Sequence, residues 1–183
     1  MKKITFPLAG LLLPCYFLLS CGHVQQTPDY GGYPESVGKI VTTKCAVSGC
    51  HDALGSGGAN GLNLTSYSSM FAGSKNGAVV VPYASGFSTV FLFTNTYQSL
   101  GAFTPPSMPL GRTPLSQDEV LTIKSWVDAG APDNNGYVMW TGPRSKIYCC
   151  NQGCDNTTVF DEQTGLITRY IPVGHGVNHS PMQ

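Results

Sequence analysis

Charge is scarce in this chain of 183 residues, and neither sign is in excess. Asp, Glu, Lys and Arg together make up 11% of the residues, with ten basic and ten acidic side chains. A protein that binds DNA or RNA carries clusters of Lys and Arg on one surface. The composition provides no such surface, so we exclude nucleic acid as a partner.

Common catalytic and zinc motifs are also missing. The chain has no Gly-x-Ser-x-Gly elbow, no His-Glu-x-x-His motif and no phosphate-binding loop. No cysteine or histidine lies between His51 and Cys149, so a closed zinc site at the first cysteine pair lacks its second pair of ligands. These absences leave no conventional hydrolase chemistry.

Long hydrophobic runs are absent beyond the N-terminus. Residues 4–19 are largely apolar, follow two lysines, and are interrupted by Pro7 and Pro14. A run this short is not a transmembrane helix, and its charged start is typical of a secretory signal peptide. We therefore expect residues 1–20 to be removed from the mature protein, which leaves eight basic against ten acidic residues and a net charge near −2.

The end of this segment, Leu18-Leu19-Ser20-Cys21, resembles a bacterial lipobox. The resemblance implies that Cys21 becomes the acylated first residue, held in a lipid bilayer by more than one chain. Residues 21–36 would then be a tether, and the protein would be a lipoprotein of the cell envelope facing the periplasm or the cell surface. Simple cleavage with a soluble product is the alternative.

Two cysteines and a histidine carry the clearest chemical signal: Cys45, Cys50 and His51. A disulfide is the ordinary alternative for two nearby cysteines in an exported protein. The usual signature for covalent haem is Cys-x-x-Cys-His, in which both thiols bond to haem and the histidine ligates iron. The spacer here is two residues longer, but its residues are small and Gly49 can adopt a positive φ. We therefore expect one haem c, held by Cys45 and Cys50 as thioethers and by His51 as proximal iron ligand.

Several motifs follow in an order that resembles the planctomycete-type cytochrome c family. They occupy residues 61–67, 71–82, 107–109, 114–119 and 123–132. The resemblance covers residues 37–136 and departs from the family in the longer spacer between the cysteines. It implies a c-type cytochrome domain over residues 37–136, built of short helices and long loops around the haem.

Helix signals independently favour a mainly α fold. Ser116 and Glu119 form a capping-box pattern, and Gly130 and Pro132 end the helix that follows. Its apolar face carries Val120, Ile123, Trp126 and Val127. Three shorter helices are predicted before it, one leading into Cys45 and two capped by Thr65 and Ser88. Their apolar residues are Val37, Ile40 and Val41; Tyr67, Met70 and Phe71; and Phe91 and Leu92.

The composition changes after residue 136. Residues 146–153, 158–161 and 171–174 are typical of short β-strands separated by turns. They resemble one repeat of the YVTN-type β-propeller family, with Tyr-Cys-Cys-Asn at 148–151. One repeat cannot close a propeller. We therefore expect residues 137–183 to be a short β-hairpin or partial propeller blade, either the start of a truncated propeller, which we favour, or a small appendage.

Three cysteines in this segment need a separate interpretation: Cys149, Cys150 and Cys154. No histidine follows Cys150 or Cys154, so haem attachment in the usual form is excluded. Successive strand residues point to opposite faces, so at most one of Cys149 and Cys150 can bridge Cys154. We expect a disulfide with one thiol left over, and metal binding is the alternative.

Met108 is the predicted distal iron ligand. It lies in a proline-rich loop, between Pro105-Pro106-Ser107 and Pro109, which can hold its side chain over a haem face. The family resemblance also implies an axial methionine in this Met-Pro stretch. Met70 is expected to pack in the core, and His175 and His179 remain the alternatives for the iron.

Three functions are compatible with these residues. The leading one is an exported, membrane-anchored c-type cytochrome that passes single electrons to or from a redox partner protein at the membrane. The second is an enzyme or sensor with an open iron position. The third is a haem-containing binding protein whose truncated propeller recognises a partner or polymer.

Overall fold

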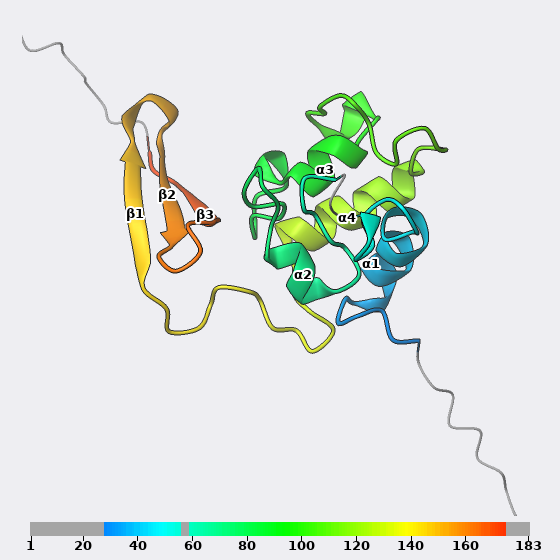
Figure 1. Cartoon of the computed structure of the whole chain (residues 1–183). Coiled ribbons are helices and arrows are strands. Elements are labelled where there is room, and N and C mark those ends of the chain that lie inside the picture. Colours follow the sequence, from blue (N-terminus) through cyan, green and yellow to red (C-terminus); the bar gives the residue numbers. More distant parts are fainter. Residues whose placement is uncertain (1–27, 56–58, 175–183) are drawn as a thin grey trace, which may run out of the picture.

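The computed structural model describes residues 28–55 and 59–174, which form a helical unit followed by a small sheet (Figure 1). The α-helices are α1 (Glu35–Ile40), α2 (Tyr67–Phe71), α3 (Thr89–Thr94) and α4 (Gln117–Asp128). The strands are β1 (Lys146–Asn151), β2 (Asn156–Asp161) and β3 (Ile167–Pro172). The predicted signal peptide, the lipidation site Cys21 and the two C-terminal histidines lie outside the described residues.

Helix α1 continues directly into a π-helical turn, Val41–Cys45. The predicted apolar stripe is confirmed, because Val37, Ile40 and Val41 are all buried. The hydroxyls of Thr42 and Thr43 donate to the carbonyl oxygens four residues earlier. Such bonds compete with regular helix bonds and bend helices. The turn ends at Cys45, whose side chain lies in the interior of the helical unit.

Helix α4 forms as its sequence predicts. The Ser116 side chain accepts a hydrogen bond from the Glu119 backbone N–H, and the Glu119 carboxylate accepts one from the Ser116 N–H at 2.8 Å. The four apolar residues of its predicted face are buried. The Trp126 indole N–H donates to the Pro132 carbonyl at 2.9 Å. The helix ends before Gly130, whose φ of +101° suits a residue without a side chain.

Two predicted caps are wrong in detail. Helix α2 is capped by Ser66, whose side chain accepts from the Ser69 N–H, whereas the Thr65 hydroxyl donates to Asn63. Ser88 occupies the N-cap position of α3 but makes no cap bond. Its fully buried hydroxyl instead accepts from the Val81 N–H, because a buried backbone donor needs a partner.

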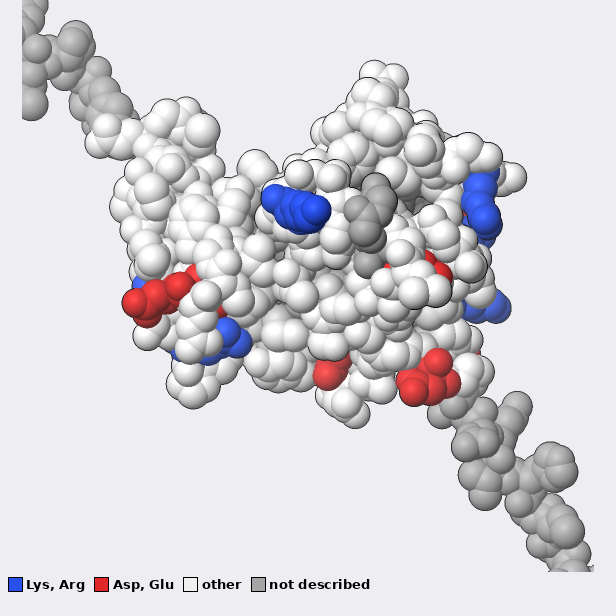
Figure 2. Space-filling model, viewed as in Figure 1, with Lys and Arg blue, Asp and Glu red and all other residues white. Residues whose placement is uncertain are grey.

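One hydrophobic core joins the helices. Its largest fully buried side chains include Tyr33, Met70, Phe91, Leu115 and Ile123. Met70 has no exposed surface, which confirms that it packs in the core. On the face seen in Figure 2, acidic and basic side chains are scattered and most of the surface is uncharged. The interior rather than surface charge therefore organises this unit.

The strands form one antiparallel sheet in the order β1-β2-β3, with a register irregularity between Val159 and Phe160. Asp161 is fully buried and bonded by Arg144 at 2.7 Å and by the Thr164 hydroxyl. Burial raises the pKa of this carboxyl, but the bonds from Thr164 and Arg144 outweigh burial and lower it. The sheet meets the helical unit through β3, where the Tyr170 and Phe87 rings lie 4.4 Å apart.

The prediction of a mainly α fold is wrong, because the described part of the chain combines four α-helices with a three-stranded antiparallel sheet. The sequence predicts strands in this region, but the fold class was assigned from the helices alone. Each strand is six residues long, whereas three of the four helices are only five or six. Much of the helical unit is therefore loop, and the protein is a mixed α and β structure.

The expected disulfide in the sheet is not formed. Cys149, Cys150 and Cys154 are exposed free thiols. Cys45, which is buried, and Cys50, which is half-buried, are also free thiols. Cys150 instead accepts a hydrogen bond from the Thr157 hydroxyl on the neighbouring strand. The strand register places Cys150 opposite Thr157 and Cys149 opposite Thr158, so neither has a cysteine as cross-strand neighbour.

Replacing Ser116 by Ala should lower the free energy of unfolding by about 0.5–2 kcal/mol, because α4 loses its N-cap bond. Urea denaturation measures this change. Ser125→Ala, an exposed position within the same helix, is the matched control and should have no such cost. Equal stabilities of the two variants would contradict the cap's role.

Candidate functional site

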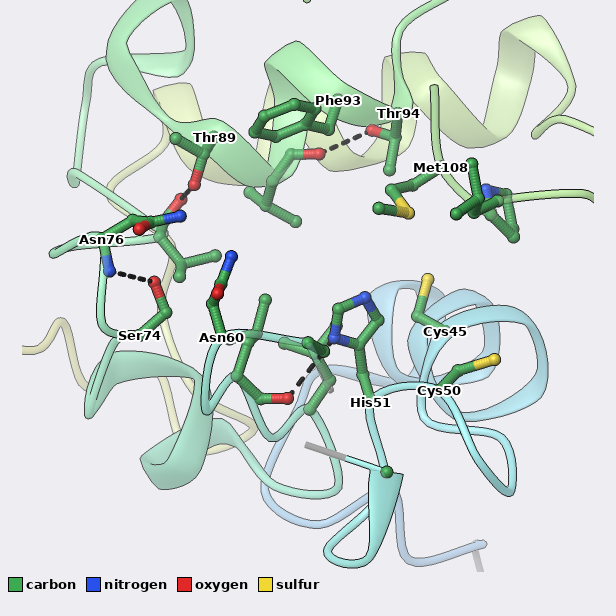
Figure 3. A pocket seen from close by; sticks show the side chains of 18 of the residues that line it. Cys45, Cys50, His51, Asn60, Ser74, Asn76, Thr89, Phe93, Thr94 and Met108 are labelled. Atoms are coloured by element: carbon green, nitrogen blue, oxygen red, sulfur yellow. Dashed lines mark hydrogen bonds between the residues drawn. The ribbon is translucent and has the colours of Figure 1, made fainter. Parts of the chain in front are cut away.

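The helical unit contains a cavity of about 570 Å³ that brings the predicted haem residues together. Cys45, Cys50, His51 and Met108 all line it. Figure 3 shows the two cysteines and His51 on one side and Met108 on the facing side. Cofactor pockets usually enclose about 300–1,000 Å³. The cavity therefore has the size of a cofactor site, with residues from both sides of the predicted haem.

The longer spacer between the cysteines folds into a compact loop. The Ala46 N–H donates to the Val41 carbonyl and closes the π-helical turn at Cys45. Because the helix does not continue, the Cys45 carbonyl can accept from another donor. That donor is the His51 N–H, at 3.2 Å. Gly49 adopts a φ of +78°, which its missing side chain permits. The loop therefore returns the histidine to the first cysteine despite the two extra residues.

His51 is oriented by a backbone carbonyl. Its Nδ1 lies 3.3 Å from the Leu62 carbonyl oxygen. An Nδ1–H that donates to this oxygen fixes the tautomer in which Nε2 carries the lone pair. The His51 carbonyl also accepts from the Leu64 N–H at 2.8 Å. The imidazole is therefore prepared to ligate a metal through Nε2.

Met108 lies in the segment between α3 and α4. Its N–H donates to the Phe93 carbonyl at 2.7 Å, which ties this loop to the end of α3. The side chain is half-buried. Figure 3 shows its sulfur on the cavity side that faces His51. The arrangement suits a second axial ligand across a flat cofactor.

The rest of the cavity wall is divided between apolar and polar side chains. Apolar residues include Leu64, Val79, Val90 and Phe93. A group of polar residues, Asn60, Ser74, Asn76 and Thr89, lies at the end away from the two cysteines (Figure 3). Sequence reasoning missed this group, because its members come from separate loops and α3. No local sequence pattern connects these residues, so the sequence alone carries no signal for them.

Burial changes the chemistry of the first cysteine. Cys45 is 8% exposed, and burial raises the pKa of its thiol to about 11, although the neighbouring Lys44 acts in the opposite direction. Lys44 is itself paired with Glu119 of α4 at 2.7 Å. Cys45 is therefore a protonated thiol at neutral pH.

The residues present fit a covalently bound haem. Two thiols, an imidazole with an available Nε2 and a facing thioether supply the attachment and axial groups of a c-type haem. Haem also has an apolar body and a carboxylate-bearing edge, and the cavity has apolar walls with one polar end. In the described parts of the chain, no three His, Cys, Asp or Glu side chains are grouped to hold a bare metal ion.

Comparison with known proteins finds no matching family model, no similar curated protein and no similar solved structure. Among the described residues, no helix is both long and apolar enough to cross a membrane.

In haem-free protein, iodoacetamide should alkylate Cys50 faster than Cys45 at about pH 8, because the Cys45 thiolate is disfavoured by burial. The Cys45 rate should rise about tenfold per pH unit up to pH 11. Peptide mapping by mass spectrometry measures both sites, and the rates should converge in urea. Equal labelling of the folded protein at about pH 8 would contradict the buried placement of Cys45.

Proposed function

We propose that the chain is an exported c-type cytochrome that carries single electrons. The observation that supports it is the placement of Cys45, Cys50, His51 and Met108 around one cavity. These residues come from two segments separated by more than fifty positions in the sequence. Their convergence was expected from the haem interpretation, whereas a disulfide between the cysteines would not require His51 or Met108 nearby.

In this proposal Cys45 and Cys50 would hold haem through thioether bonds, and His51 and Met108 would ligate the iron. When bound, haem supplies an iron that alternates between the ferrous and ferric states and so transfers one electron at a time. The Leu62 carbonyl keeps His51 in the required tautomer. The Phe93 carbonyl holds the backbone at Met108. The apolar part of the cavity wall would lower the local dielectric constant around the iron.

An electron carrier fits this chain better than a catalyst or sensor. With both His51 and Met108 bound to it, the iron would have no open position for a substrate or gas. A thioether ligand also raises the reduction potential relative to a second histidine, which suits a carrier on the oxidising side of an electron-transfer chain. The proposed partners are a redox protein at the membrane and the lipid bilayer, reached through acylated Cys21.

Covalent haem attachment tests the proposal directly. The protein should be produced in a host that assembles c-type cytochromes, then denatured and examined for haem by mass and peroxidase staining. Wild type and the control Cys149→Ala, Cys150→Ala should retain haem, whereas Cys45→Ala, Cys50→Ala should not, because only the first pair lines the cavity. A wild-type protein without covalent haem would overturn the proposal.

Met108→Ala should keep covalent haem but lose the weak far-red band of methionine-bound ferric haem. It should also lower the reduction potential and let the ferrous iron bind carbon monoxide. Spectra with and without carbon monoxide measure these effects, and wild type should bind the gas poorly. Met70→Leu, which changes a methionine in the core, is the matched control.

If the spectrum of Met108→Ala is the same as that of wild type, another residue binds the iron, and His175 and His179 are the first to test. Ready binding of carbon monoxide by wild type would favour the enzyme or sensor function instead.

A further inference from the structure

A second cavity, of about 510 Å³, lies where the sheet meets the helical unit. The helical unit contributes Pro82 and Tyr83, the connecting segment contributes residues 138–141, and all three strands contribute side chains. None of its lining residues lines the candidate haem cavity. It is therefore a separate site that electron transfer does not use.

The charged side chains that line this second cavity are all basic. Lys146 of β1 and Arg169 of β3 line it, and no Asp or Glu does. Lys146 forms no ion pair with any described residue. The Arg169 guanidinium lies 4.3 Å above the centre of the Tyr83 ring and likewise has no described carboxylate partner. Two cations that lack counter-ions at one cavity favour an anionic ligand.

Three aromatic residues complete the lining: Tyr83, Trp140 and Tyr148. The first two have backbone φ values of 66° and 71°. A bulky residue rarely adopts such a conformation, and where it does the strain is often found at ligand sites. The two strained aromatic residues of the described chain both line this one cavity.

Neighbouring groups hold this strained arrangement in place. The Tyr83 N–H donates to the Val127 carbonyl of α4 at 2.8 Å. Gly130 permits the Tyr83 ring to approach, since a Cβ there would lie only 2.6 Å from the ring. Trp140 is 8% exposed and lies under the Arg144 guanidinium, 5.0 Å from its ring centre. Tyr83 and Trp140 are therefore preorganised, which lowers the cost of binding.

We propose that the second cavity binds a small ring-shaped molecule that carries a carboxylate. The aromatic side chains Trp140 and Tyr148 would contact the ring, and Lys146 and Arg169 would bond the carboxylate. Charge-assisted hydrogen bonds are among the strongest that proteins make, and Arg can bind a carboxylate with two parallel bonds. An acidic sugar and an aromatic acid share this chemistry.

Calorimetric titration of the full chain with sodium glucuronate and with sodium benzoate distinguishes these two sources. Saturable binding of either anion to wild type is expected, and the one that binds identifies the ring type. The uncharged analogues methyl glucoside and benzamide should bind at least tenfold more weakly, because they lack the carboxylate.

Lys146→Met and Arg169→Gln should each weaken binding of the anion by about tenfold or more. Lys146→Met removes no described ion pair, so its folding is not at risk. Arg112→Gln removes a positive charge from an exposed residue outside the cavity and should bind as wild type does. Circular dichroism confirms that each variant is folded.

The proposal is overturned if neither anion binds wild type, if the uncharged analogues bind as strongly, or if both cavity variants bind as wild type does. None of these outcomes depends on haem, because the binding site shares no residue with the haem cavity.

Discussion

The candidate haem site depends on one backbone hydrogen bond, from the His51 N–H to the Cys45 carbonyl. In a regular α-helix that continued past Cys45, this carbonyl would accept from the next turn. The π-helical turn ends at Cys45 instead and leaves the oxygen available. The bond then draws the histidine back to the first cysteine. It holds the histidine beside the first cysteine despite the two extra spacer residues, and the Leu64 N–H and the Leu62 carbonyl then hold His51 from the other side.

A group of buried aromatic residues keeps the helices around this loop in position. The Tyr33 hydroxyl donates to the Ser66 carbonyl at 2.8 Å, and the Tyr67 hydroxyl donates to the Ala131 carbonyl at 2.8 Å. The Tyr33 ring also packs edge-on against Tyr67 and Trp126. Burial raises the pKa of both tyrosines, so both hydroxyls remain protonated donors. These contacts connect the beginnings of α1 and α2 to the end of α4, and α1 leads to Cys45.

A feature of the structure could be predicted from the sequence where its signal is contained in neighbouring residues. The cap and apolar face of α4 are contained within about fifteen consecutive residues, and they were predicted correctly. Thr65 was misassigned as the cap of α2, because Ser66 supplies the cap bond. Ser88 is the N-cap residue of α3 as predicted, but the buried Val81 N–H takes its hydroxyl. The polar end of the haem cavity and the whole second cavity were missed, since their residues meet only in the folded chain. The sheet was wrongly expected to be a minor appendage for the same reason. One of its contacts with the helical unit joins Phe87 and Tyr170, which are far apart in the sequence.

One short segment of the chain separates the two cavities, and different residues of it line each one. Ala78 and Val79 line the haem cavity, and Pro82 and Tyr83, a few residues later, line the second one. Between them, Val80 and Val81 are buried, and Val81 is bonded to the Ser88 hydroxyl. Coupling between sites requires an element with two alternative arrangements, but this segment is fixed by buried packing and by hydrogen bonds at both ends. Closely packed interiors resist small displacements. Occupation of the second cavity should therefore leave the proposed iron ligands undisturbed, and the two proposed sites should act independently.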